Sequence, residues 1–136
     1  YNMRLGDPET QAVLPLLESD LLTLFEASIE KSLEKVELSW HTGATCCVVL
    51  ASGGYPEEYV NNLPIHGIKE FNQTDCQLFT AGIALQEQQF VTAGGRVLNI
   101  VAKGNTPLEA RNKAYAAIQE IQFKDCYCRN DIGNIN

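Results

Sequence analysis

The chain has 136 residues, of which 45% are hydrophobic and 20% are charged, and its formal net charge is −7. This length suits one compact domain, or a domain with an appendage, and is enough to bury a hydrophobic core. No apolar run approaches the roughly 20 residues of a membrane-spanning helix, and no signal-peptide pattern is present. Because nucleic-acid binding needs clustered lysines and arginines, the scattered basic residues of this acidic chain argue against a general nucleic-acid binder. We therefore expect a soluble cytoplasmic protein without membrane or nucleic-acid partners.

Residues 1–35 are predicted to form a short helical segment. Asp7 is a candidate N-cap, since a proline follows it at the first helical position. Ser19-Asp20 offers a second cap, and the apolar residues of 21–29 recur at helical spacing. We expect the apolar face of this second helix to belong to the core.

From Val36 onward the pattern changes to alternation and β-branched runs, which predicts strands. The predicted strands are residues 36–40, 44–51, 76–85, 88–92 and 96–103, with 76–85 and 88–92 forming a hairpin. Residues 106–109 (Thr-Pro-Leu-Glu) are a capping box that opens a helix to about residue 121. The expected core face of this helix is Leu108, Ala114, Ile118 and Ile121. Because hairpins and tight turns dominate, we expect an α+β fold, with a short helical part followed by an antiparallel sheet domain that carries one long helix.

The five cysteines are Cys46, Cys47, Cys76, Cys126 and Cys128. Their number is odd, and neither close pair matches the Cys-x-x-Cys spacing of a zinc site. Metal or redox chemistry is one interpretation of them. The pattern favours the other, which is reduced thiols packed on the strands of a cytoplasmic protein.

Four polar residues near the start could carry chemistry. Asn2 and Arg4 would point to the same face of a strand, and Asp7 and Glu9 follow them. An amide oxygen with carboxylates suits a hard cation such as Mg²⁺, and a guanidinium beside it suits a phosphate or a carboxylate. On chemistry alone, a capped helix with a surface ion pair is the more common arrangement, so both interpretations stay open.

Four stretches of the sequence carry a resemblance to a known family. The first is residues 1–11, Tyr-Asn-Met-Arg-Leu-Gly-Asp-Pro-Glu-Thr-Gln. The later ones are Leu50-Ala-Ser-Gly-Gly-Tyr-Pro56, Gly94-Gly-Arg-Val-Leu98 and Arg129-Asn-Asp-Ile-Gly133. Together, and in this order, they resemble glycinamide ribonucleotide synthetases (phosphoribosylamine–glycine ligases), in which the first stretch closes the ATP-grasp portion. The resemblance covers essentially the whole chain, although residues 125–128 are richer in cysteine than is usual in that family.

The resemblance implies roles for individual residues. Asn2 matches the family's second Mg²⁺ ligand, and Arg4 matches the arginine that faces the reacting phosphate and carboxylate. Arg96 is of special interest because its Gly-Gly setting lets backbone approach a ligand closely. The substrate-binding residues that the resemblance implies are Asp7, Glu9, Arg96, Arg129 and Asp131.

The implied reaction joins glycine to 5-phosphoribosylamine through glycyl phosphate, and gives glycinamide ribonucleotide, ADP and phosphate in purine biosynthesis. The implied cofactor is Mg²⁺ or Mn²⁺, with ATP as co-substrate. Residues 1–35 would be the end of the ATP-grasp domain, and residues 36–136 the C-terminal α+β domain. Because the chain starts at Tyr1 rather than at a methionine, we expect a trimmed start or a piece of a longer protein. The missing N-terminal part would then be its partner, and this piece would be inactive alone.

Two other interpretations stay open. The first is a stand-alone α+β module that binds a phosphorylated metabolite and performs no chemistry. The second is another ATP-grasp carboxylate–amine ligase with different substrates. The combination of the first and last stretches favours the glycinamide ribonucleotide synthetase family over both.

Overall fold

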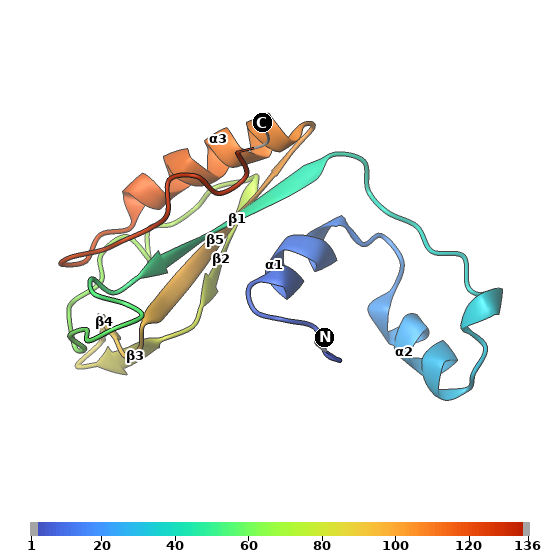
Figure 1. The fold of residues 1–136 in the computed structure, drawn as a ribbon, viewed down its shortest axis with the longest axis horizontal. Helices are drawn as coiled ribbons and strands as arrows, with labels where there is room; N and C mark the ends of the chain where they lie inside the picture. The colour runs from blue at the N-terminus through green and yellow to red at the C-terminus, as the bar shows by residue number, and fades with distance from the viewer. Residues whose placement is uncertain (1–2, 135–136) are drawn as a thin grey trace.

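The computed structural model describes residues 3–134, and within them a helical segment precedes an antiparallel sheet that carries one long helix (Figure 1). The helices are α1 (Glu9–Val13), α2 (Leu21–Ile29) and α3 (Pro107–Ala117), with 3₁₀ turns η1 (Leu14–Leu16), η2 (Leu33–Lys35) and η3 (Ile118–Glu120). The strands are β1 (Ala44–Ala51), β2 (Cys76–Thr80), β3 (Ile83–Gln86), β4 (Gln89–Thr92) and β5 (Arg96–Gly104). This arrangement confirms the predicted α+β class.

The described strands form a three-stranded sheet in the order β1-β5-β2 and a separate β3–β4 hairpin, all antiparallel. The central strand, β5, is buried from Val97 to Ala102 because it has a neighbour on each side and is covered on both faces. Residues Val48 and Leu78 pair with Ile100 from the two sides. A strand that is buried on both faces reads as a near-continuous apolar run, as β5 does.

Two predicted strands differ from the structure. The strand expected over 76–85 ends at Thr80, because the chain turns at Ala81 and Gly82 before β3 begins. The alternating residues 36–40 form no strand, since their only described sheet contact is an isolated bridge between Trp40 and Leu17. Alternation describes an extended backbone, whereas a strand also needs a neighbour with free N–H and C=O groups.

Helix α3 covers one face of the three-stranded sheet (Figure 1). Its buried residues are Ala110, Ala114 and Ala117, followed by Ile118 in η3. The predicted cap at Thr106 is present, since its hydroxyl accepts a hydrogen bond from the Glu109 N–H at 3.2 Å. The reciprocal bond of a capping box is displaced by one residue, because the Glu109 carboxylate accepts from the Asn105 N–H at 2.8 Å. Leu108, which we expected in the core, is 64% exposed. The small alanines lie closest to the sheet and allow the helix backbone to approach it.

Helix α1 lies near the opposite face of the sheet, where the Thr45 hydroxyl of β1 donates to the Ala12 carbonyl at 2.5 Å (Figure 1). The prediction that Asp7 caps this helix is wrong: the N-cap residue is Pro8, and no side-chain cap bond is present there. Asp7 instead accepts a hydrogen bond from Gln11 Nε2 at 2.7 Å and pairs with a residue of the sheet domain.

Helix α2 stands away from the sheet (Figure 1). Its predicted cap is confirmed, since the Asp20 carboxylate accepts from the Thr23 N–H at 2.8 Å. Its predicted core face is wrong for this chain: among the described residues of α2, Ala27 alone is buried, while Phe25 is 52% and Ile29 is 82% exposed. Helical spacing shows that one face is apolar, but not that anything covers it.

The five cysteines lie in two parts of the fold. In the described part of the chain all five cysteines are free thiols, and Cys46, Cys47 and Cys76 lie on strands as expected. Cys126 and Cys128 lie in the irregular C-terminal segment instead. Among residues 3–134, no helix is long and apolar enough to span a bilayer.

Candidate functional site

The Gly94-Gly95 turn that precedes Arg96 is held by Ser52, which is fully buried. The Ser52 hydroxyl donates to the Gly94 carbonyl at 2.9 Å, and the Ser52 N–H donates to the Gly95 carbonyl at 2.8 Å. The ring of Tyr55 lies directly against Gly95, where a side chain would collide with it. Two of the family-like stretches therefore contact each other, and they fix the backbone from which Arg96 projects.

The stretch from Arg129 to Gly133 is brought to the same place by the C-terminal segment. Tyr127 pairs with Ala51 through two backbone hydrogen bonds of 2.7 and 2.9 Å, so the segment runs beside the end of β1. Arg129 follows, and its guanidinium donates to both carboxylate oxygens of Asp131 at 2.9 and 2.6 Å. Hydrogen bonding to the guanidinium lowers the pKa of Asp131 below its ordinary value.

Arg96 joins the sheet domain to the N-terminal segment. Its Nη1 donates to the Asp7 carbonyl at 2.8 Å, and its Nη2 lies 3.1 Å from the Asp7 carboxylate, across a separation of 89 residues. Gln11 donates to the other oxygen of the same carboxylate. The two side chains of the ion pair are 41% and 44% exposed, so water reaches both of them.

Arg96 and Arg129 border one cavity of about 210 Å³. Two tyrosines and a proline form its other walls, and apolar residues of β1 and the C-terminal segment complete the lining: Pro8, Cys47, Val49, Ala51, Tyr55, Tyr127 and Ile132. Guanidinium groups bind phosphates and carboxylates through paired hydrogen bonds. An apolar-walled cavity with two of them at its border can take a small ligand with an anionic end.

Cys47 contributes to the cavity as an apolar group. Burial raises the pKa of its thiol to about 11. The thiolate is the nucleophilic form of a cysteine, and at neutral pH almost none is present. This high pKa agrees with a packing role for Cys47 and leaves the two arginines as the charged residues of the cavity lining.

The structure gathers some of the predicted site residues and separates others. Asp7 and Asp131 lie with Arg96 and Arg129, as ion-pair partners of the two arginines. Arg4 is exposed and donates to the neighbouring Leu5 carbonyl at 2.9 Å. Glu9 folds back over Gly6. Neither Arg4 nor Glu9 is among the described residues that line the cavity, and Asn2 lies outside the described range.

The aromatic walls of the cavity, Tyr55 and Tyr127, were not predicted from the sequence. Tyr55 lies inside the stretch that runs from Leu50 to Pro56, directly after two glycines. This position in a family-like stretch could have indicated that Tyr55 lies at the site. Tyr127 carried no such signal, because it reaches the cavity only through its pairing with Ala51, a contact across 76 positions that no local pattern encodes.

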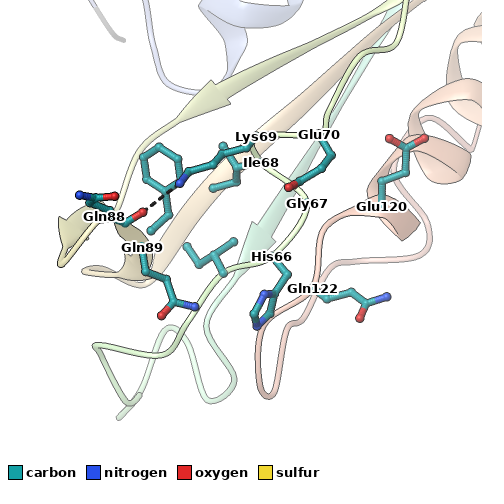
Figure 2. Close-up of a pocket in the computed structure, with 11 residues that line it drawn as sticks. His66, Gly67, Ile68, Lys69, Glu70, Gln88, Gln89, Glu120 and Gln122 are labelled. Atoms are coloured by element: carbon teal, nitrogen blue, oxygen red, sulfur yellow. Dashed lines mark hydrogen bonds between the residues drawn. The ribbon is translucent and has the colours of Figure 1, made fainter.

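A second pocket, of about 490 Å³, lies between residues 65–70, the β3–β4 turn, the end of η3 and Gln122 (Figure 2). Lys69 Nζ donates to the Gln88 carbonyl at 3.0 Å across it, while His66 and Gln122 pair through their backbones. In the described part of the chain, none of the predicted site residues lines this pocket. Among residues 3–134 there is also no group of three or more His, Cys, Asp or Glu side chains that could hold a metal ion.

The fold and the arginine-lined cavity define an α+β domain suited to anionic small molecules. The family described as "Phosphoribosylglycinamide synthetase, C domain" matches residues 45–135. The chain belongs to this family. The match begins one residue after the start of β1, and the predicted domain boundary between residues 35 and 36 stays a prediction.

Curated relatives and a solved structure are similar to almost the whole chain. It is 44% identical to a phosphoribosylamine--glycine ligase of Fusobacterium nucleatum, over 99% of this chain and 32% of that protein. It is 45% identical to the ligase of Clostridium acetobutylicum, over 98% of this chain and 31% of that protein. The crystal structure of the Thermotoga maritima phosphoribosylamine--glycine ligase matches with a TM-score of 0.74 and 31% identity, covering 96% of this chain and 32% of that one. The chain thus spans about a third of the length of the relatives that it matches.

Proposed function

We propose that this chain is the C-terminal part of an ATP-dependent ligase of purine biosynthesis. The complete enzyme joins glycine to 5-phosphoribosylamine through glycyl phosphate, and releases glycinamide ribonucleotide, ADP and phosphate. The observation that carries the proposal is the convergence of the family-like stretches on one cavity bordered by Arg96 and Arg129. The curated relatives, which are similar over nearly the whole chain, carry the name of this activity.

Arg96 and Arg129 are proposed to hold the phosphate of phosphoribosylamine. A phosphate monoester carries close to two negative charges at neutral pH, which two guanidinium groups can share. In the structure each arginine is bound to a carboxylate, Asp7 or Asp131. These carboxylates fix the direction of the guanidinium groups, and each arginine keeps further N–H donors for a ligand.

Arg4 is proposed as the catalytic residue of the chain. Its guanidinium is exposed, and among the described residues its bond to the Leu5 carbonyl uses one of its five N–H donors. When the phosphoryl group moves from ATP to glycine, and again when the amine displaces it, negative charge gathers on the transferred group and the carboxylate. A fixed cation beside that charge lowers the barrier for both steps. Glu9 is proposed to lie beside the same substrates.

Mg²⁺ or Mn²⁺ is the proposed cofactor, with ATP as co-substrate, and it would supply charge neutralisation at the moving phosphoryl group. Asn2 is the ligand that this chain is proposed to give. It lies outside residues 3–134, and the described residues form no ligand set of their own. The steps assigned to this chain are therefore binding and charge stabilisation by its arginines.

The first test of the proposal is the activity of the isolated chain. We expect no release of ADP when ATP, glycine and phosphoribosylamine are supplied, because the chain spans only about a third of its ligase relatives. ADP release that depends on both glycine and phosphoribosylamine would contradict this assignment of the chain as an incomplete part.

The second test uses the complete enzyme with Arg4→Ala. We expect turnover to fall by at least about 100-fold, which is typical for the loss of a positioned charge stabiliser. Lys35→Ala is the control, since Lys35 is also an exposed cation and lies in η2, outside the proposed site. Unchanged turnover in Arg4→Ala would remove Arg4 from the mechanism.

A further inference from the structure

The C-terminal turn that carries Arg129 is fastened to α3 by two side chains. The Tyr115 hydroxyl donates to the Arg129 carbonyl at 2.6 Å and accepts from the Ile132 N–H at 3.2 Å. Arg111 donates from Nε to the Ile132 carbonyl at 3.1 Å and from Nη2 to the Asn130 carbonyl at 2.9 Å. Four hydrogen bonds therefore fix both ends of a turn that has no strand or helix of its own.

The two fastening residues form one rigid unit. They lie one helical turn apart, and the guanidinium carbon of Arg111 is 4.7 Å from the centre of the Tyr115 ring, which is a cation–π contact. Between and beside them, Ala110 and Ala114 are fully buried against the sheet. The helix that carries Arg111 and Tyr115 therefore cannot shift without opening the core.

Arg129 is consequently held both at its backbone and at its side chain. Tyr115 holds its backbone carbonyl, and the Asp131 carboxylate holds its guanidinium through two hydrogen bonds. Arg129 borders the cavity that Arg96 also borders, whereas Arg111 and Tyr115 are not among the described residues that line it. The two residues of α3 thus act on the cavity only through the turn.

We propose that Arg111 and Tyr115 are positioning residues for the phosphate-bearing substrate, because they set the place of Arg129 at the border of the cavity. This inference rests on the proposed function, in which Arg129 and Arg96 share the phosphate. Bidentate recognition by a guanidinium depends on its direction, and a displacement of about 1 Å at a binding group can cost about 100-fold in rate. Loosening the turn weakens binding of phosphoribosylamine and leaves the sites of ATP and glycine unaffected.

The experiment compares Tyr115→Phe with the unchanged complete enzyme. Phenylalanine keeps the ring and its contact with Arg111 but removes both hydrogen bonds of the hydroxyl. We expect the KM for phosphoribosylamine to rise about 5- to 10-fold, while kcat and the KM values for ATP and glycine stay within about twofold, as for the loss of a uniform binding contact. Arg111→Lys, which keeps the charge but loses the forked donors, is expected to act in the same direction.

Lys113→Gln is the matched control, since Lys113 lies on the same helix but bonds to Asp75 and Glu109 rather than to the turn. We expect it to leave all three KM values within about twofold, as is usual for a surface ion pair. Hydrogen exchange of the C-terminal peptide is the second measurement. It should become about tenfold faster in Tyr115→Phe than in Lys113→Gln, because the Ile132 N–H loses its acceptor.

The outcomes separate this inference from the proposed function. Faster exchange together with a selective rise of the KM for phosphoribosylamine supports the positioning role. If exchange accelerates but only Arg129→Ala raises that KM, the positioning role is overturned while the proposed function stands. If Arg129→Ala itself leaves the KM unchanged, Arg129 does not bind this substrate, and both assignments fall. Unaltered exchange in Tyr115→Phe would overturn the fastening of the turn itself.

Discussion

The helical segment and the sheet domain use similar apolar residues with opposite results. In α2, the large side chains Leu22, Phe25 and Ile29 are between 52% and 82% exposed. In β5, Leu98 and Ile100 are fully buried between neighbouring strands and under α3. The difference lies in what each element has beside it. A surface helix needs a partner for its apolar face, whereas a central strand is supplied with partners by the sheet to which it belongs.

The comparison also separates two ways in which a helix can contact the rest of a protein. Helix α3 presents alanines to the sheet and leaves Leu108 in solvent, so its contact depends on close approach of backbones. Helix α2 presents large side chains and buries only Ala27 among its described residues. Large apolar residues on a face therefore do not identify the face that is buried within this chain.

The strongest test of this contrast is Leu98→Ala in β5. Leu98 is fully buried and pairs with Leu50 on one side and Thr80 on the other. We expect the free energy of unfolding to fall by about 2 to 5 kcal/mol, since truncation removes apolar contacts and leaves a cavity that a sheet cannot close. Urea unfolding of the chain, followed by circular dichroism, measures the change. A loss below about 1 kcal/mol would mean that β5 is not the centre of the core.

A smaller effect is expected from Ser52→Ala, which tests the polar clamp at the edge of the same domain. The substitution removes the hydrogen bond to the Gly94 carbonyl inside a fully buried site. We expect a loss of about 1 to 3 kcal/mol, because the carbonyl keeps its desolvation cost without its donor. The control is Ser28→Ala, at an exposed position of α2, which the same unfolding measurement should find within about 0.5 kcal/mol of the unchanged chain. Equal losses in the two variants would remove Ser52 from the clamp.

The parts of the fold that local sequence determines were predicted well. The β1 and β5 runs, the cap at Thr106 and the cap at Asp20 each depend on residues within a few positions, and all are present. The segment 36–40 failed because a strand requires a partner that its own sequence does not specify. The same reason explains Asp7, whose carboxylate does not cap α1 but pairs with Arg96, 89 residues further along the chain.

The candidate site shows the same difference between local patterns and contacts that are distant in sequence. Arg96 and Arg129 were predicted because each lies in a stretch that resembles the family, and the structure places both at one cavity. Arg111 and Tyr115 were not assigned to the site, since nothing in the helical pattern around them shows which segment crosses the helix. Their proposed role depends on their hydrogen bonds to the turn of the C-terminal segment, which lies against α3. A local pattern can mark a residue that contacts a ligand more readily than one that holds such a residue in place.

The ion pair between the two regions is itself expected to be weak, which Asp7→Asn tests. The Asp7–Arg96 pair is more than 40% exposed on both sides, and exposed ion pairs contribute about 0 to 1 kcal/mol. We expect a loss within that range that shrinks as salt is added. Glu57→Gln is the matched control, because it removes one negative charge from an exposed residue outside the ion pairs found in the described chain. A larger loss that persists in high salt would show that the N-terminal segment is docked more firmly than its exposed ion pair implies.

The smallest effect is expected from Phe25→Ser on the apolar face of α2. Phenylalanine and serine have similar helix propensities, and the Phe25 side chain is 52% exposed. The free energy of unfolding of the isolated chain should therefore change by less than about 0.5 kcal/mol. If the preceding part of the complete enzyme covers this face, the same substitution there should cost about 1 to 3 kcal/mol, the range for losing a buried aromatic contact only in part. Equal effects in the two proteins would mean that α2 stays exposed in both, and a large loss in the isolated chain would mean that its apolar face already has a partner there.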